Sequence, residues 1–478
     1  MNINYSILKK YPLCHRCFGR LYAKLLHTTN LERGKGLKIA KAIELEARLK
    51  LLEEELEKSE INEEIEGIEK NDDIKDTKNI ENKDDDEQKN EEDQITTKTD
   101  EILKEITEIK EELKEVYKSG LTEIKVNLDV EPEKCPWCKN IFDEENLNEI
   151  SEKAAELLKE YEYDAFLVGT TLPKKIKELE KELETPFIES IRQEFGREIG
   201  KRLVAKTGKR VDKVNPDIVV LINPYNKKIN LQVNPIFIKG RYRKLVRGIP
   251  QTHWHCRSCR GKGCPKCDFT GKQYPTSVEE IVAEPFMKAT KGSGESFHGA
   301  GREDIDVKML GNGRPFVLEI KEPKIRKIDL EKLAEEVNKS GKVEILDVSY
   351  GVRKDVVFFK NEAHKKTYLA LVECEDEVSN DELTQLTKKL ENLTINQRTP
   401  KRVSHRRADL VRVRKVYKVW AHKIDNHNFE LKIFCDGGLY IKELISGDDG
   451  RTSPSVSEIL GKKCICKVLD VLDVHDKE

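Results

Sequence analysis

The sequence predicts an α+β protein in which a smaller α/β unit precedes a larger C-terminal domain of strands and a few helices. In the smaller unit, apolar residues recur at helical spacing from Ile188 to Leu203, next to the strand-like runs DAFLVGTTL and DIVVLI. After residue 276, β-branched and aromatic runs alternate with helical segments. The strand candidates there are DVKML, RPFVLEI, DVVFF, TYLALVEC, RVRKVYKVW and NFELKIFC.

Charge is distributed unevenly along the 478 residues, although the formal net charge is only −2. Residues 51–120 hold 27 Asp and Glu against 11 Lys and no Arg, which leaves 76 basic and 62 acidic residues elsewhere. A basic body suits a partner rich in phosphate, while a merely well-solvated surface is the alternative.

These patterns predict an accessory domain at 1–50 and 120–275, an acidic insertion at 51–119, and a C-terminal domain at 276–478. The insertion contains too little apolar surface to form a core. Its ends, LLEEELEK and EILKEITEIKEELKEVYK, carry apolar residues at steps of three and four. A disordered middle and a charged helical hairpin therefore both remain open.

The chain shows no run of about 18 apolar residues, and its start, MNINYSILKKYPLC, has no apolar signal core. We therefore expect a cytoplasmic protein without a membrane segment. Eight of the twelve cysteines fall in four CxxC pairs, which is typical of metal binding in a reducing compartment. The other four, Cys374, Cys435, Cys464 and Cys466, are expected to be reduced thiols.

Two structural zinc sites are predicted from the CxxC pairs. The tight cluster CRSCRGKGCPKC supplies four thiolates from one short loop, which satisfies tetrahedral zinc. The other two pairs must meet across the acidic insertion to form a second site, with unrelated pairs or a redox CxxC as the alternatives. The predicted ligands are Cys256, Cys259, Cys264 and Cys267 for the first site, and Cys14, Cys17, Cys135 and Cys138 for the second.

A basic segment within residues 239–247, which is expected to form a loop after a strand, is a candidate for RNA binding. We expect its cations to contact backbone phosphates and Tyr242 to stack on a base. The cations are Lys239, Arg241, Arg243, Lys244 and Arg247.

The stretch FHGAGREDIDVKMLGNGRPFVLEI, residues 297–320, resembles the motif around the catalytic aspartate of pseudouridine synthases. Its extended form GREDxDVKxLGxGRPFxLEI closely resembles the archaeal and eukaryotic tRNA pseudouridine synthases with an N-terminal THUMP-containing, zinc-binding half, the tenth of the numbered eukaryotic set. The segments KKTYLALV, QRTPKRVSHRR and GGLYIKELISGDDGRT follow in the same order. The resemblance covers nearly the whole chain except the acidic insertion.

This resemblance implies a catalytic domain with a central mixed, mainly antiparallel sheet and an N-terminal THUMP-like α/β domain. It also implies isomerisation of uridine to pseudouridine in the T arm of tRNA, at positions 54 and 55 in standard tRNA numbering. The accessory half is expected to hold the acceptor-stem end. We expect tRNA as the partner, a monomer, structural zinc and no organic cofactor.

Carried over by position, the resemblance makes Asp304, not the neighbouring Asp306, the catalytic carboxylate. Lys442 lies where related synthases place a basic residue against the aspartate. Tyr368 is the expected stacking surface for the flipped base, with a hydroxyl that can help to remove the C5 proton, and Tyr440 is a second substrate contact. Arg302 and Arg314 are expected either to contact an RNA phosphate or to position the loop that carries Asp304.

Two other classes of function remain. The first is a noncatalytic THUMP and zinc protein that binds tRNA, which the intact set of Asp304, Tyr368 and Lys442 argues against. The second is another THUMP-linked tRNA enzyme, such as a methyltransferase or a thiolation enzyme. It is disfavoured because the chain has neither a Rossmann-type glycine fingerprint nor a P-loop.

Overall fold

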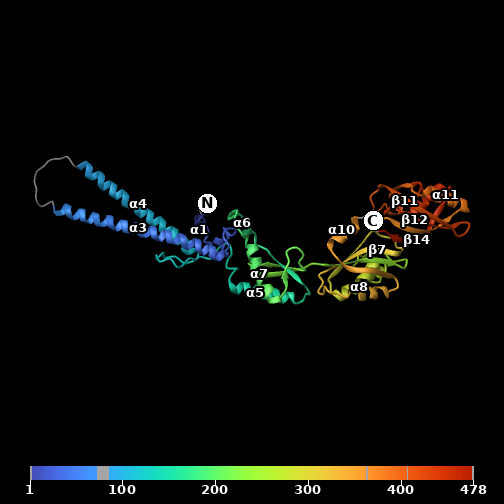
Figure 1. Ribbon diagram of the computed structural model, residues 1–478, viewed down its shortest axis with the longest axis horizontal. Coiled ribbons are helices and arrows are strands. Elements are labelled where there is room, and N and C mark those ends of the chain that lie inside the picture. The colour runs from blue at the N-terminus through green and yellow to red at the C-terminus, as the bar shows by residue number, and fades with distance from the viewer. Residues whose placement is uncertain (1–2, 73–84, 362–363, 406, 476–478) are drawn as a thin grey trace. The chain divides into compact units, whose positions relative to one another are not determined.

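The computed structural model describes residues 3–72, 85–361, 364–405 and 407–475 (Figure 1). The chain divides into two compact units. The first comprises Met1–Leu158, Phe166–Val214 and Val219–Leu231, and the second comprises Lys159–Ala165, Asn215–Ile218 and Gln232–Glu478. None of the helices in the described ranges is long and apolar enough to cross a membrane.

The first unit combines helices with a four-stranded sheet in the order β2-β1-β3-β4. Its strands are β1 (Ala165–Thr170), β2 (Arg210–Val211), β3 (Ile218–Asn223) and β4 (Lys228–Val233). Its helices are α1 (Ser6–Lys10), α2 (His15–Arg20), α3 (Asn30–Asp72), α4 (Asp85–Lys118), α5 (Glu144–Leu158), α6 (Lys174–Glu182) and α7 (Ile191–Thr207). The helix predicted from residue 188 begins at Ile191 because Ser190 caps it, accepting a hydrogen bond from the Gln193 amide.

The acidic segment forms two long helices, α3 and α4, which run antiparallel (Figure 1). Ion pairs fix this direction: Lys41 meets Glu112 at 3.1 Å near the base, and Lys98 meets Glu55 at 3.0 Å farther out. The helical-hairpin alternative is therefore correct for both flanks of the insertion. The expected disordered middle falls on residues 73–84, outside the described residues.

The second unit is built on a ten-stranded sheet in the described part of the chain, with the order β13-β10-β11-β12-β9-β14-β7-β5-β8 and with β6 also paired to β7. The β14–β7 pair is parallel and the other pairs are antiparallel, as predicted for a mixed, mainly antiparallel sheet. The strands are β5 (Ile236–Lys244), β6 (Gly294–Gly299), β7 (Lys308–Lys321), β8 (Val343–Gly351), β9 (Lys366–Cys374), β10 (Thr394–Arg398), β11 (Val411–Lys423), β12 (Asn428–Cys435), β13 (Thr452–Ser453) and β14 (Cys464–Val474).

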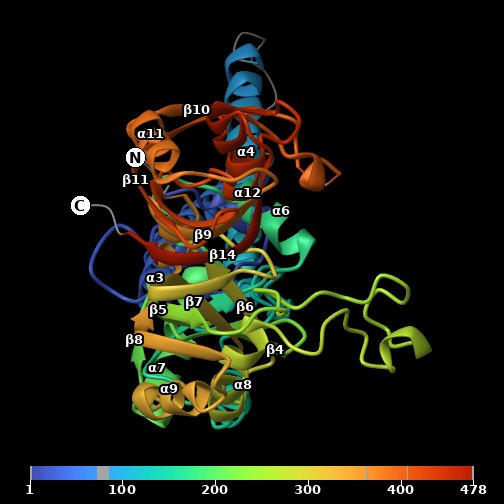
Figure 2. The same ribbon diagram turned by 90° about the vertical axis from the view of Figure 1, so that its right-hand side faces the viewer.

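Two groups of helices cover this sheet. Helices α8 (Val278–Thr290) and α9 (Leu330–Asn338) pack together and against β8, and they lie side by side below it in Figure 2. Helix α11 (Asn380–Leu390) packs on β11, α12 (Ile441–Ser446) packs on β14, and α13 (Val456–Leu460) packs between α11 and α12. One apolar core runs under both groups, from Ile236 to Val474.

Two expectations about this unit are wrong. DVVFF lies in helix α10 (Arg353–Asn361), not in a strand, and a carboxylate oxygen of Asp355 accepts a hydrogen bond from the Val352 amide just before the helix. The expected boundary at 275/276 also fails to describe the compact units, because β5 pairs with β7 and β8 inside the large sheet. The second unit therefore resumes at Gln232.

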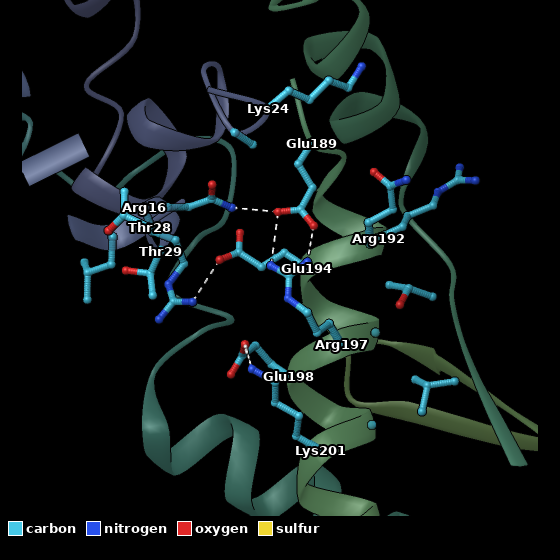
Figure 3. Close-up of a pocket in the computed structure, with 18 of the residues that line it drawn as sticks. Arg16, Lys24, Thr28, Thr29, Glu189, Arg192, Glu194, Arg197, Glu198 and Lys201 are labelled. Carbon is cyan, nitrogen blue, oxygen red and sulfur yellow. Dashed lines mark hydrogen bonds and ion pairs between the residues drawn. The ribbon is translucent and has the colours of Figure 1, made fainter. Parts of the chain in front are cut away.

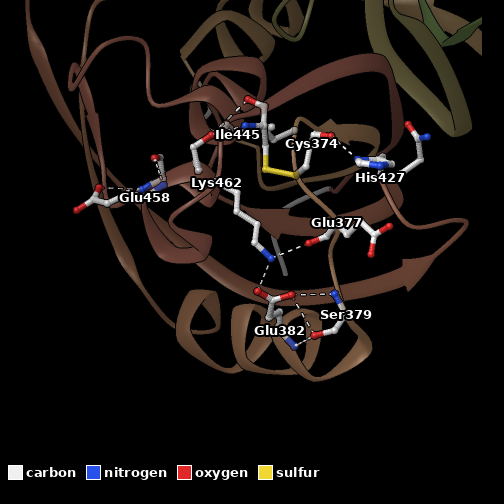
Figure 4. The surroundings of a disulfide bond; sticks show 12 residues. Cys374, Glu377, Ser379, Glu382, His427, Ile445, Glu458 and Lys462 are labelled. Carbon is white, nitrogen blue, oxygen red and sulfur yellow. Dashed lines mark hydrogen bonds and ion pairs between the residues drawn. A yellow bond between two sulfur atoms is a disulfide. The ribbon is translucent and has the colours of Figure 1, made fainter.

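The expectation that all four remaining cysteines are reduced thiols is also wrong. Cys374 and Cys464 form a disulfide between β9 and β14, where they lie directly opposite each other with Cα atoms 4.2 Å apart (Figure 4). Ninety positions separate them in sequence, and only the pairing of the two strands brings them together. Cys435 and Cys466 are free, as predicted.

Candidate active site

The segment that carries Gly301 to Asp304 is a loop between β6 and β7. Gly301 adopts a left-handed conformation with φ +83°, which favours glycine. A Cβ atom there would also lie 3.1 Å from both Arg314 Nη1 and Lys366 Nζ. The Ala300 amide donates to the Pro315 carbonyl, and the Val307 amide donates to the Asp304 carbonyl. The loop is thus held by its own backbone and by the start of β7.

A buried polar network fixes the loop from below. The side chain of Glu303 points inward, where its Oε2 accepts hydrogen bonds from Tyr242 at 2.8 Å and from Arg314 Nε at 3.0 Å. Gln251 Nε2 donates to the Tyr242 hydroxyl and to the Gly301 carbonyl. Lys244 Nζ donates to the Asp304 carbonyl at 3.0 Å. Because these buried groups satisfy one another, the loop is held in a defined position.

Asp304 itself faces the other way, and its side chain is 34 % exposed. Its Oδ2 atom lies 2.8 Å from Arg402 Nη1 and 3.8 Å from Lys442 Nζ. Lys442, the predicted partner, lies closer to Asp306, at 2.7 Å from its Oδ2 atom. The predicted contact between Lys442 and Asp304 is therefore present, but Arg402 makes the closer one.

The two predicted tyrosines border this site. Tyr368 lies on β9, opposite Val471 of β14, and β14 in turn pairs with β7. Burial raises the pKa of Tyr368, and the charge of Asp304 adds to the effect. The phenol therefore stays protonated near neutral pH, so it can stack or donate a hydrogen bond but offers no basic oxyanion. Tyr440 directly precedes α12, with the Arg402 guanidinium 5.8 Å from its ring centroid.

Lys366, two residues before Tyr368, is a buried lysine beside the loop. Its pKa is lowered to about 7, first by burial and then by Arg314, while Cys435 and Glu303 act in the opposite direction. Between pH 7 and the ordinary value of 10.5, the unfolded chain keeps a proton that the folded chain has released. The free energy of unfolding therefore rises with pH in this window, by about 1.4 kcal/mol per pH unit from this group.

We expect Lys366→Met to stabilise the second unit most at pH 7 and below, with the advantage shrinking toward pH 10. Urea unfolding of the native chain and the variant at several pH values checks this, since the difference between them isolates one group. A difference that stays constant with pH contradicts the prediction.

The predicted RNA-binding cations lie on or just after strand β5, not in a loop, which corrects part of that prediction. Lys244 and Tyr242 are fully buried, so the first cannot reach phosphate and the second cannot stack on a base. Arg241 donates to the carbonyls of Asn312 and Gly313, and Arg247 to that of Asp306. Arg247 also donates to the Leu469 carbonyl and pairs with Asp470 at 2.6 Å. Arg243 contacts the Gly311 carbonyl and Glu344, and Lys239 contacts Asp355. These side chains, except that of Lys244, are partly exposed.

The two predicted arginines of the active-site motif take different positions. Arg314 is 1 % exposed and donates to Glu303 and to the Ala300 carbonyl, which fits loop positioning and excludes a phosphate contact. The guanidinium of Arg302 lies 5.0 Å from the ring centroid of Trp254. The sequence interpretation missed Arg402, although QRTPKRVSHRR, which carries it, belongs to the resemblance.

Both cysteine quartets assemble as predicted, and within each one the sulfur atoms lie within 4.8 Å of one another. Zinc–sulfur bonds of about 2.3 Å in a tetrahedron require sulfur separations of about 3.8 Å. The structure has 3.6 Å for Cys14 to Cys138, and 3.9 and 3.8 Å for the cross pairs Cys256 to Cys264 and Cys259 to Cys267. No disulfide forms within either quartet. The spacing and the donor atoms therefore fit tetrahedral zinc.

The first unit contains a cavity of about 1680 Å³ between residues 16–33 and helix α7 (Figure 3). Some of its charges are paired, since Arg16 lies 3.0 Å from Glu194 and Arg197 forms an ion pair with Glu189. Arg192 and Lys213 also line it, and neither forms a hydrogen bond or an ion pair with the described residues. The cavity thus has positive charge available for an anionic ligand.

Family models match most of the second unit and part of the first. The model described as "Pus10, C-terminal" matches residues 237–475, and the "Pus10 THUMP domain, archaeal" matches residues 150–223. The first match begins in β5, which agrees with the place of this strand in the large sheet.

The curated relatives match between 72% and the whole of the chain. A protein of Methanocaldococcus jannaschii is 60% identical over 99% of this chain and 94% of its own length, and one of Methanococcus voltae is 55% identical over 100% and 99%. One of Pyrococcus furiosus is 45% identical over 72% and 85%. All three are named tRNA pseudouridine synthase Pus10, so the protein is of the pseudouridine synthase class. Within that class, the chain belongs to the Pus10 family.

Proposed function

We propose that this chain isomerises uridine to pseudouridine in the T arm of tRNA, at positions 54 and 55. The observation that carries the proposal is the partly exposed Asp304 carboxylate, on a loop held by buried hydrogen bonds, beside Arg402 and Lys442. The family, whose members bear the name tRNA pseudouridine synthase, supports the reaction class.

The reaction breaks the bond between ribose C1′ and uracil N1, turns the base, and rejoins it through C5; the C5 proton then leaves and N1 takes up a proton. An ionised carboxylate suits this chemistry because it attacks as a nucleophile and needs no organic cofactor. Arg402 and Lys442 place positive charge 2.8 and 3.8 Å from Oδ2 of Asp304, and the buried network around Glu303 holds the loop in place. Attack on C1′ and attack on C6 both use this carboxylate.

The target uridine must leave the folded RNA arm to reach Asp304, and a flipped base needs a surface to stack on. Tyr368 serves this purpose because it lies in the same site and its ring is held by the sheet. Tyr440, which borders Arg402 and Arg412 at 5.8 and 6.0 Å, contacts the adjoining RNA. The partly exposed cations Lys239, Arg241, Arg243 and Arg247 add phosphate contacts.

The first unit holds the end of the tRNA acceptor stem in the cavity beside α7. Arg192 and Lys213 supply charges that no residue in the described ranges pairs with, and a phosphate-rich strand is the ligand that matches them. The two cysteine quartets hold one zinc ion each, without an open coordination position, so the metal is structural.

Incubating purified chain with an unmodified tRNA transcript, without added cofactor, and mapping pseudouridine by chemical detection tests the proposal. We expect product at both T-arm positions. Product at only one position would narrow the proposal to that position. Tight tRNA binding without any product would contradict it and favour the noncatalytic tRNA-binding alternative.

A further inference from the structure

The two carboxylate oxygens of Asp304 differ in their surroundings. The closest approaches of both Arg402 and Lys442 are to Oδ2, at 2.8 and 3.8 Å. Oδ1 accepts no hydrogen bond from any residue that the structure describes. One oxygen is therefore held by cations, and the other is available for attack.

Arg402 is itself firmly held on the side away from Asp304. Its Nε atom donates to Glu443 Oε1 at 2.6 Å, and its Nη2 atom lies 3.5 Å from Glu443 Oε2. The Glu443 side chain is only 7 % exposed, on helix α12, and the described residues place no second cation against it. A buried carboxylate with one guanidinium partner fixes the position of that guanidinium.

Lys442 has a different first partner. Its ammonium lies 2.7 Å from Asp306 Oδ2, which is 65 % exposed, and it reaches Asp304 only at the limit of an ion pair. A lysine ammonium is a point charge on a flexible stem, whereas the planar guanidinium of arginine can contact two carboxylates in fixed directions. Of the two cations, only Arg402 has the geometry to orient Asp304.

We propose that Arg402 is a catalytic residue that holds Oδ2 of Asp304 and so presents Oδ1 to the uridine, and that Glu443 is the positioning residue that fixes Arg402. The proposal rests on the proposed function. In this proposal, Lys442 pairs with Asp306 and adds positive charge to the site but does not orient Asp304. No covalent bond to Arg402 forms at any step.

Single-turnover pseudouridine formation, with the enzyme in excess over tRNA, tests this role. We expect Arg402→Met to slow the step by about 100-fold or more, as removal of an orienting charge contact at a reacting group does. The dissociation constant for tRNA, measured on the same preparations, should change less than about 3-fold. Arg402→Lys should recover part of the rate, because charge returns without the fixed fork.

The variant Glu443→Gln tests whether Glu443 acts by positioning Arg402 or only by stabilising the fold. If Glu443 acts through Arg402, the double variant Arg402→Met with Glu443→Gln should be no slower than Arg402→Met alone, within about 2-fold. If the rate losses of the two single variants multiply in the double variant, Glu443 does not act through Arg402, and its positioning role is overturned. The matched control is Arg202→Met, which removes a guanidinium that also bridges two carboxylates, Glu144 and Glu198, but lies in the first unit.

The assay distinguishes failure of the proposed function from failure of the role proposed for Arg402. If the native chain makes no pseudouridine, the proposed function fails. If the native chain is active and Arg402→Met reacts within about 3-fold of it at saturating enzyme, the role of Arg402 fails. A loss that saturating enzyme fully rescues assigns Arg402 to RNA binding, and this also overturns the proposal.

Discussion

Asp304→Asn is expected to reduce pseudouridine formation by at least about a thousandfold, because the amide cannot attack carbon as a carboxylate does. The substitution nearly preserves shape, and the loop is held by Glu303, Arg314 and Gln251, which do not contact this side chain. The fold and the affinity for tRNA should therefore remain. The measurement is the single-turnover rate on an unmodified tRNA transcript, together with a binding isotherm.

Asp306→Asn is the matched control, two residues away on the same loop. Asp306 is more exposed, at 65 % against 34 % for Asp304, and it pairs with Lys442. Its pKa is lowered; burial opposes this shift, and the hydrogen bond and charge of Lys442 outweigh it. We expect the control to lose roughly tenfold or less, because it affects only the charge around the site. Equal losses in the two variants would show that the site depends on total charge and not on one nucleophile.

The sequence was sufficient to nominate Asp304 and Tyr368 through the family resemblance, and CxxC spacing was sufficient to predict that the eight paired cysteines form two quartets. The fold class followed for a related reason, since strands such as TYLALVEC and NFELKIFC have periodicities that are visible without tertiary context. The pairing of Cys14 with Cys138 required only that two ligand pairs complete one tetrahedron.

The remaining features depend on contacts between distant segments. Arg402 reaches Asp304 because the segment after β10 lies beside the loop before β7, and no local pattern encodes that proximity. The sequence did not reveal that Tyr242 and Lys244 of β5 are buried, because a buried strand face is expected to be apolar. Here these two polar side chains bond to Glu303 and to backbone carbonyls. The disulfide of Cys374 likewise depends on the register of two strands far apart in sequence.

Loss of zinc from the first quartet is expected to disrupt the first unit. Cys17 and Cys135 close a chain segment that contains both long helices, and binding of structural zinc contributes roughly 10–16 kcal/mol to the folding of small zinc domains. Next to the quartet, buried Arg20 donates to Cys17 Sγ at 3.3 Å and pairs with Glu194. Without the negative charges of the thiolates, the buried Arg20 guanidinium keeps, among the described acidic residues, only Glu194 to offset the cost of burying its positive charge.

Cys135→Ser should therefore remove about one zinc equivalent and lower the thermal midpoint of the first unit by at least about 10 °C. Cys256→Ser provides the comparison, because its quartet closes a loop of only twelve residues, in which Cys259 and Cys264 are half-buried. That variant should also lose about one zinc equivalent, but with little change in the thermal midpoint. Metal analysis with calorimetry measures both quantities. The assignment holds that zinc in the first quartet joins the N-terminus to the segment after α4. A native chain without zinc, or equal destabilisation by the two substitutions, would contradict it.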